Sequence, residues 1–172
     1  MDSPHAALAL FCAVYLGRVS LVNSLLAWGV PVDSKDQNGQ TALFYAASKG
    51  HERMVKILLR RGAKIDCHDT HQRTPMSYAA SNGNVHVVQF LVARGDDIEF
   101  NDKQYRTPLS HATFECHDRV VEILLEKLAK LRLLAKWMRS DSRLLSAGIM
   151  VAGPSCVASC VHTYGGGITG GL

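Results

Sequence analysis

Apolar residues along this chain fall into short runs that polar stretches separate at a nearly constant interval. The runs that occupy matching positions are Val19–Leu26, Val55–Leu59, Val87–Val92 and Val120–Leu125. Within them, apolar residues follow each other at the three- and four-residue steps of one helix face. A second, shorter apolar stretch follows Thr41, Thr74 and Thr107, which stand 33 residues apart. The pattern therefore predicts a repeated pair of helices.

Residue types at the ends of these stretches predict where each helix begins and ends. The threonines are natural N-caps, and Pro75 and Pro108 follow at the first helical position, where a missing N–H costs nothing. Glycines in register allow left-handed backbone after the first helix (Gly17, Gly50, Gly83) and end the second (Gly29, Gly62, Gly95). Polar links join the units at Ser34–Gln40, Cys67–Arg73 and Phe100–Arg106. Such units bury their apolar faces only by stacking on their neighbours.

These motifs resemble the T-P-L-H signature of ankyrin repeats, which have a 33-residue period. The matching segments are Gly39–Leu43, Arg73–Met76, Arg106–Leu109, Ala46–His51 and Leu58–Asp66. The resemblance implies an all-α ankyrin-repeat solenoid of about four units over residues 4–130. The unit boundaries are expected near 4–36, 37–69, 70–102 and 103–130, with the first unit degenerate.

Departures from the family pattern concentrate in the last unit. The usual histidine of the signature is Phe44, Ser77 or Ser110, and Gln72 and Tyr105 replace the turn glycine that Gly39 supplies. His111 stands where an apolar residue is usual, and Cys116 where glycine is usual. We therefore expect the last unit to be the least stable part of the array.

Leu128 replaces the glycine that would end the fourth unit, so one long amphipathic helix is predicted over residues 118–139. Its polar face is basic, with Lys127, Lys130, Arg132, Lys136 and Arg139. We interpret it as a C-terminal capping helix. A basic amphipathic helix can also lie on an anionic membrane or meet an acidic partner.

Residues 140–172 form a Gly/Ser-rich tail that is expected to be disordered or loosely docked, with no Lys, Arg, Asp or Glu from Leu144 on. The run Leu144–Val161 has the length of a membrane span, but Gly148, Gly153 and Pro154 interrupt it. A tail anchor is the alternative.

Composition and charge are those of a soluble globular protein, with 47% apolar and 20% charged residues. Residues 1–126 are nearly neutral, with 13 Lys/Arg against 14 Asp/Glu, so the basic balance belongs to the C-terminal region. Five irregularly spaced cysteines do not form a disulfide framework, and a cytoplasmic or nuclear location is expected. The apolar stretch Ala6–Val14 lacks a preceding Lys or Arg and fits the first unit, which argues against a signal peptide.

We find no pattern for catalysis, cofactor binding or a metal site. Nucleophile-elbow and phosphate-loop motifs are missing from the sequence. Cys67, His68 and His71 lack the spacing of a zinc knuckle, and Cys156 and Cys160 have no second pair. Asp96 and Asp97 are interpreted as exposed loop acids.

In ankyrin arrays the variable contact positions lie on the finger loops and the concave side of the first helices. Carried over by register, the partner-binding candidates are Lys35, Gln37, Asn38, Gln40, Ser48, Lys49, His68, Thr70, His71, Arg73, Ser81, Asn82, Asn101, Lys103, Gln104, Arg106, Phe114 and Glu115. Five are Lys or Arg and one is acidic, which favours an acidic or polar protein partner, with Arg106 and Phe114 as anchors. The few, widely spaced cations do not match nucleic-acid binding.

The resemblance implies a non-enzymatic, monomeric protein-interaction module that acts as an adaptor, inhibitor or co-regulator. The alternative is a membrane-associated scaffold held by the basic helix and residues 144–161.

Overall fold

The computed structural model describes residues 4–145, and the side chains of residues 5–136. Between residues 4 and 145 it holds eight helices and no strand, in four pairs. The pairs are α1 (Pro4–Tyr15) with α2 (Val19–Ala27), α3 (Ala42–Ser48) with α4 (Glu52–Arg60), α5 (Pro75–Ser81) with α6 (Val85–Ala93), and α7 (Pro108–Phe114) with α8 (Asp118–Leu145). The predicted all-α architecture is confirmed. The chain divides into two compact parts, one ending at Ala129 and one beginning at Lys130.

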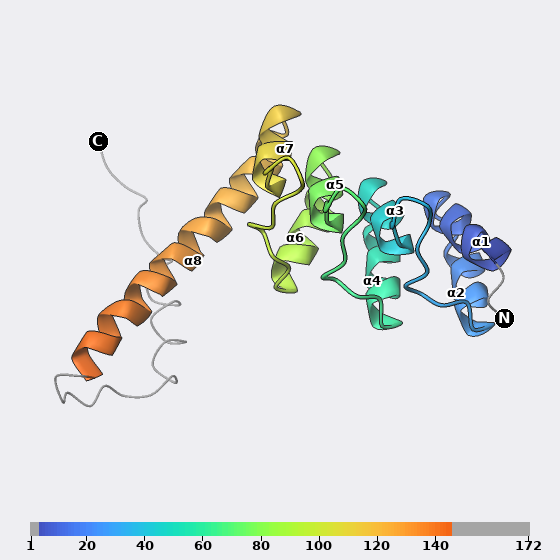
Figure 1. The fold of residues 1–172 in the computed structure, drawn as a ribbon, viewed down its shortest axis with the longest axis horizontal. Coiled ribbons are helices and arrows are strands. Elements are labelled where there is room, and N and C mark those ends of the chain that lie inside the picture. Colours follow the sequence, from blue (N-terminus) through green and yellow to red (C-terminus); the bar gives the residue numbers. More distant parts are fainter. Residues whose placement is uncertain (1–3, 146–172) are drawn as a thin grey trace, which may run out of the picture. The chain divides into compact units, whose positions relative to one another are not determined.

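In the first of these two parts, the helix pairs stand side by side in chain order (Figure 1). We call the first helix of each pair the inner helix and the second the outer helix. Each inner helix contacts the next, α1 with α3, α3 with α5 and α5 with α7. This stacking follows from the 33-residue period, because every pair presents the same apolar positions to its neighbours.

Threonine takes the N-cap position of α3, α5 and α7, as predicted. Thr74 and Thr107 each accept a hydrogen bond at 3.2 Å from the backbone N–H three residues on. Thr41 makes no capping bond, and its Oγ1 lies 3.9 Å from the Cys67 Sγ. The first of these caps is therefore positional only.

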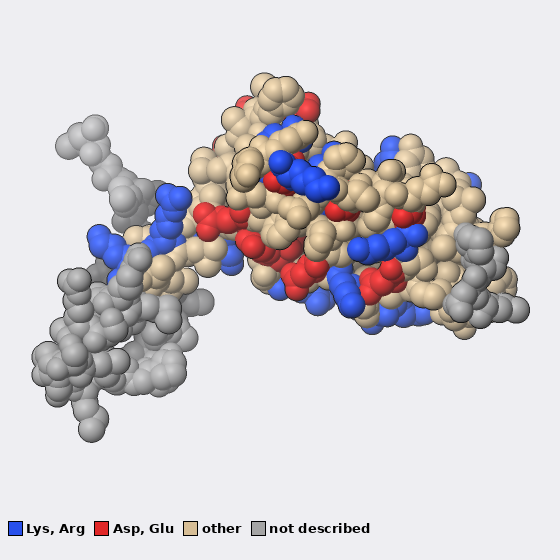
Figure 2. Space-filling model, in the orientation of Figure 1, with Lys and Arg blue, Asp and Glu red and all other residues tan. Residues whose placement is uncertain are grey.

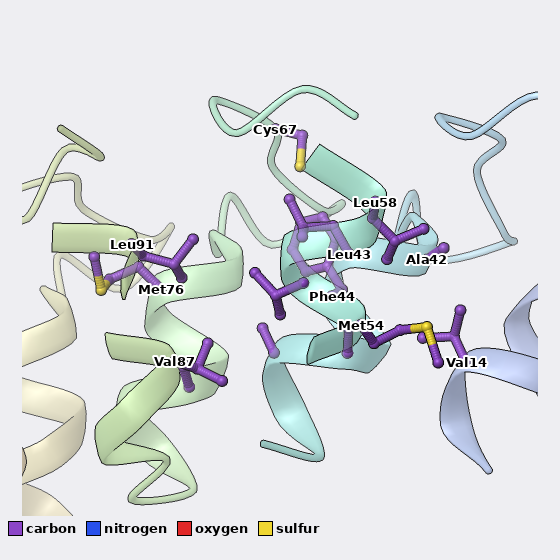
Figure 3. Packing of buried hydrophobic residues seen from close by; sticks show 14 of the residues in the cluster. Val14, Ala42, Leu43, Phe44, Met54, Leu58, Cys67, Met76, Val87 and Leu91 are labelled. Carbon is purple, nitrogen blue, oxygen red and sulfur yellow. The ribbon is translucent and has the colours of Figure 1, made fainter. Parts of the chain in front are cut away.

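The core is one apolar cluster that runs from α1 to the start of α8. Phe44 packs edge-on against Tyr78, with ring centroids 5.6 Å apart. Met54 of α4 points toward Val14 of α1, so the side chains of one unit fill space beside the preceding one (Figure 3). Each fully buried side chain of this size stabilises the fold by roughly 2 kcal/mol.

A second link between units is a row of polar side chains that reach back to carbonyls at the end of the preceding inner helix. The bonds join His51 Nε2 to Tyr15 O, Asn84 Nδ2 to Ala47 O and Ser48 O, and His117 Nε2 to Ser81 O. Gly17, Gly50 and Gly83 lie beneath them. A Cβ on Gly50 would stand 2.6 Å from the Asn84 Oδ1. Glycine is therefore needed here both to leave room for the Asn84 side chain and to adopt a φ of 71°.

Three non-glycine residues, Gln72, Tyr105 and Cys116, adopt left-handed backbone with φ of 58°. This conformation costs about 1 kcal/mol at each position. Cys116 matches Gly17, Gly50 and Gly83 in register, but no further unit stacks on it within the described residues. Its Cβ therefore meets no side chain of a following unit, and only the strain of the left-handed backbone remains. Two of the three strained residues fall in the fourth unit, where the sequence predicts the least stable repeat.

Helix α8 begins at Asp118 but ends at Leu145, not near Arg139 as predicted. Residues 140–145 are therefore helical, which corrects their assignment to the tail. The physical reason is that no Gly or Pro interrupts the sequence from Asp118 until Gly148. The rest of the tail, including most of the proposed apolar segment 144–161, lies outside the described residues. No helix within residues 4–145 is long and apolar enough to cross a membrane.

The prediction that Asp96 is an exposed loop acid is wrong. Its side chain is buried, while that of Asp97 is exposed. Its backbone N–H donates to Leu91 O at the end of α6, the bond that Val30 and Ala63 make in earlier units. Asp96 thus occupies an apolar register position.

Candidate functional site

Each polar link folds into a finger-shaped loop around an aspartate that sequence analysis did not single out. Asp69 Oδ1 accepts hydrogen bonds from the backbone N–H groups of His71 and Arg73, at 2.8 and 2.9 Å. The Asp69 N–H donates to Arg73 O at 3.0 Å, which closes the loop. Asp36 and Asp102 make the same bonds in their own fingers.

The fingers are joined to one another through their backbones. Thr70 N–H donates to Asn38 O at 2.9 Å, and Lys103 N–H donates to His71 O at 3.0 Å. The three loops therefore form one hydrogen-bonded row along the edge of the array.

The same aspartates tie each finger to its inner helix. Their Oδ2 atoms accept hydrogen bonds from the side chain nine residues on: Asp36 from Tyr45 at 2.7 Å, Asp69 from Tyr78 at 2.9 Å, and Asp102 from His111 at 3.1 Å. His111, which was expected to break an apolar pattern, takes the register position of the two tyrosines and replaces their hydroxyl group. Because an ionised carboxylate can only accept, the His111 Nε2 carries the proton.

These contacts shift the pKa of the groups that make them. Burial acts to raise the pKa of Asp102, but the backbone N–H groups of Arg106 and Gln104 and the Arg106 guanidinium outweigh it and hold the pKa at about 2. Similar donors keep the pKa of Asp69 below its ordinary value despite burial. Burial, with the hydrogen bond to Asp36, raises the pKa of Tyr45 to about 12. At neutral pH the second and third fingers therefore each hold a carboxylate and a neutral donor.

Arg106 and Arg73, both predicted to contact a partner, also form ion pairs within their own fingers. Arg73 lies 3.2 Å from the buried Asp69 carboxylate and stacks on the Tyr78 ring at 4.5 Å. Arg106 lies 3.0 Å from the buried Asp102 carboxylate. Each guanidinium group thus stabilises its own finger, and the carboxylate of that finger compensates much of its charge. On the face that Figure 2 shows, basic and acidic side chains alternate over the repeat body.

The structure leaves all eighteen predicted contact residues accessible. Gln40, Ser48, Arg73 and Ser81 are half-buried and the other fourteen are exposed. Lys35, Lys49 and Lys103 remain as exposed cations outside the finger ion pairs, and Lys49 Nζ lies 4.1 Å from the Tyr15 ring centroid. Phe114 is also exposed, as is Tyr105 at the tip of the last finger.

A groove of about 960 Å³ lies between α1 and the first finger. Its walls are Ala7, Leu8, Phe11, Cys12, Tyr15 and Leu16 of α1, Lys35, Asp36, Gln37 and Asn38 of the finger, and Tyr45 of α3. Three predicted residues line it, but none of the α1 residues was predicted.

Alignment of the repeats by their 33-residue period could have identified both missed features, the finger aspartates with their donors and the groove beside α1. Asp36, Asp69 and Asp102 stand 33 residues apart, and so do Tyr45, Tyr78 and His111. The four exposed α1 residues of the groove, Leu8, Cys12, Tyr15 and Leu16, match Thr41, Tyr45, Ser48 and Lys49 of the next unit. The inner helix of the first unit is thus more apolar at positions where later units are polar.

Within residues 4–145 no three His, Cys, Asp or Glu side chains gather as metal ligands would. His68 and His71 are exposed, whereas Cys67 is buried, and burial raises the pKa of its thiol to about 11. Cys156 and Cys160 lie outside the described residues.

The paired helices, the period and the row of fingers define a repeat protein whose stacked units present one extended face. The chain matches the family described as "Ankyrin repeats (3 copies)" over residues 10–102 and again over 54–134. No curated protein matches it. The chain belongs to the ankyrin-repeat family, and ankyrin repeats are general modules for protein–protein interaction.

Proposed function

We propose that this protein is a non-enzymatic adaptor, inhibitor or co-regulator that holds an acidic or polar protein partner. The contact face consists of the finger loops and the exposed side of the inner helices α1, α3, α5 and α7. We further propose a cytoplasmic or nuclear location, on the irregular cysteine pattern.

The observation that carries the proposal is the preformed row of fingers. Each finger is fixed within itself, to the next finger and to its inner helix by the bonds around Asp36, Asp69 and Asp102. A surface that is already ordered loses little conformational entropy on association, so more of the contact energy appears as affinity.

Charge on this face selects the partner. The Asp36 carboxylate lines the groove but already accepts from two backbone N–H groups and the Tyr45 hydroxyl. Lys35, Lys49 and Lys103 are exposed and lie outside the finger ion pairs. These ammonium groups favour carboxylates on the partner and accelerate its approach at low ionic strength.

The groove beside α1 supplies the apolar part of the contact. Leu8, Tyr15 and Leu16 are exposed there, and they can bury one or two apolar side chains of the partner. An acidic segment with an apolar residue next to its carboxylates meets both requirements. A few residues buried near the centre of an interface carry most of its binding free energy, and tyrosine is enriched among them.

The test is an affinity capture from cell lysate, read by mass spectrometry, with two charge-matched variants. Lys35→Glu/Lys103→Glu reverses two cations of the contact face. Arg53→Glu/Lys64→Glu makes the same change in charge on α4 and the loop that follows it, where both side chains are exposed. Arg73 and Arg106 are left intact, because replacing them would disturb the fingers themselves.

We expect at least one protein that wild type and the α4 variant retain and the contact-face variant loses. Its recovery should fall as salt is raised. Equal recovery by all three proteins would place the binding site elsewhere and contradict the proposal.

A further inference from the structure

Helix α8 carries a narrow apolar seam along one side. The residues Val121, Leu124, Leu128, Leu131 and Ala135 follow at alternating steps of three and four, which is the spacing of a coiled-coil seam. Leu124 is fully buried, and Val121 and Leu128 are partly buried against the core. Leu131 is 41% exposed, however, and Ala135 is exposed as well. The later part of the seam therefore has room for another element.

Basic residues flank the seam on both sides. In heptad positions, Lys127 is a g residue and Arg132 is an e residue. Residues 127–136 include four Lys or Arg and no Asp or Glu. A parallel second copy would set Lys127 against Arg132, and an antiparallel copy would set each against its own kind. Like charges at these positions disfavour pairing between two copies of this chain.

The arrangement also differs from that of a membrane-surface helix, which gathers apolar residues on one face and charges on the other. Leu133 is 66% exposed, and at 100° per residue it stands roughly 170° from the seam. Lys130 and Lys136 share that side of the helix. A helix lying flat on lipid would either leave Leu133 in water or bring these lysines into the apolar layer.

We propose that the Leu128–Ala135 segment of α8 docks an acidic amphipathic helix of another protein. The partner helix would place apolar residues against Leu128 and Leu131, with Leu134, 54% exposed, at the edge of the contact. Glu or Asp at its own flanking positions would meet Lys127 and Arg132. This second binding surface is independent of the finger row.

Three synthetic peptides of three heptads each serve as probes. The first has Leu at a and d and Glu at e and g, the second keeps Leu and has Lys at e and g, and the third keeps Glu and has Ala at a and d. Binding to the full chain is measured by fluorescence anisotropy at low and at high salt. We expect the Leu/Glu peptide to bind roughly tenfold tighter than either control, because it alone matches both the seam and its charges.

The deciding variant is Lys127→Glu/Arg132→Glu, which should reverse the preference in favour of the Leu/Lys peptide. The variant Arg53→Glu/Lys64→Glu, with the same change in charge on another surface, should keep the wild-type preference. Equal binding of the Leu/Glu and Ala/Glu peptides would reduce the effect to net charge and overturn the proposal. So would an unchanged preference after the charge reversal.

Two further measurements separate the competing occupants. Light scattering of wild type should give a monomer, and a dimer that Leu131→Glu abolishes would make a second copy the occupant. Binding to anionic phosphatidylserine vesicles without binding to the Leu/Glu peptide would assign α8 to a membrane. The contact-face variant Lys35→Glu/Lys103→Glu should keep peptide binding, so this proposal and the proposed function can fail separately.

Discussion

Replacing Asp96 by Asn should stabilise this protein by an amount that grows with pH. Asp96 is only 7% exposed, and its Oδ2 is a buried oxygen for which the described residues provide no hydrogen-bond partner. Burial, aided by the charges of Asp66 and Asp97, raises its pKa from 3.8 to about 7. Earlier units place Val30 and Ala63 at this register position, where no charge must be desolvated.

The size of the effect follows from linkage. Below pH 4 the carboxyl is neutral in both states and costs nothing. As pH rises from about 4 to 7, the unfolded chain releases this proton while the folded chain retains it, so the unfolded state gains. A pKa difference of about three units corresponds to about 4 kcal/mol, which is fully present above pH 7.

The assay is urea unfolding followed by far-UV circular dichroism at pH 4 and pH 8. Asp96→Asn should raise the free energy of unfolding by up to about 4 kcal/mol at pH 8 and by less than about 1 kcal/mol at pH 4. Asp96→Ala, which leaves no polar group to desolvate, should show the same pH dependence. The control Asp97→Asn, at an exposed neighbour, should stay within about 0.5 kcal/mol at both pH values. An equal gain at both pH values, or a loss at pH 8 in both Asp96 variants, would show that the buried Asp96 charge does not destabilise the fold.

Three further substitutions test the contacts that hold the fingers and units together, each by urea unfolding. Gly50→Ala should destabilise the protein by at least roughly 1 kcal/mol more than Gly62→Ala. Both glycines have positive φ, but only the first Cβ would meet Asn84, and equal losses would contradict this steric role. Tyr78→Phe should cost about 1–2 kcal/mol, because a buried finger carboxylate loses a donor, and an unchanged midpoint would count against that bond. The pKa of Asp102 is lowered to about 2, so its carboxylate stabilises the fold above pH 4 and loses that effect as pH falls to 2. Asp102→Asn should therefore lower the free energy of unfolding by about 2 kcal/mol at pH 7 and leave it unchanged near pH 2. A loss that does not vary with pH would contradict this linkage.

Much of the fold could be predicted because its determinants are local and periodic. Thr74 followed by Pro75 marks a helix start wherever it stands, and a glycine such as Gly50 marks a helix end. The 33-residue register then fixes which helices pair and stack. These signals depend on residue type and spacing alone, so the sequence contains them in full.

The features that were missed depend mainly on the direction that individual side chains take in the fold. The sequence does not show that Arg73 and Arg106 form ion pairs with the buried carboxylates of their own fingers, although both arginines stay accessible. Nor does it show that the loop after α6 carries Asp96 inward. The groove beside α1 was missed for a related reason, since its apolar character appears only when the first unit is compared with later ones by register. Helix α8 extends beyond its predicted end because that end was placed where the amphipathic pattern becomes weak, and no helix-breaking residue stands there.

Hydrogen–deuterium exchange of the protein alone and with the partner recovered by affinity capture tests most directly whether the finger loops and inner helices form the contact face. We expect slower exchange in α1, which lines the groove, and in the finger loops 35–40, 68–73 and 101–106, with no change in α4 and α6. Protection confined to the outer helices α4 and α6, with the fingers and α1 unaffected, would contradict this expectation.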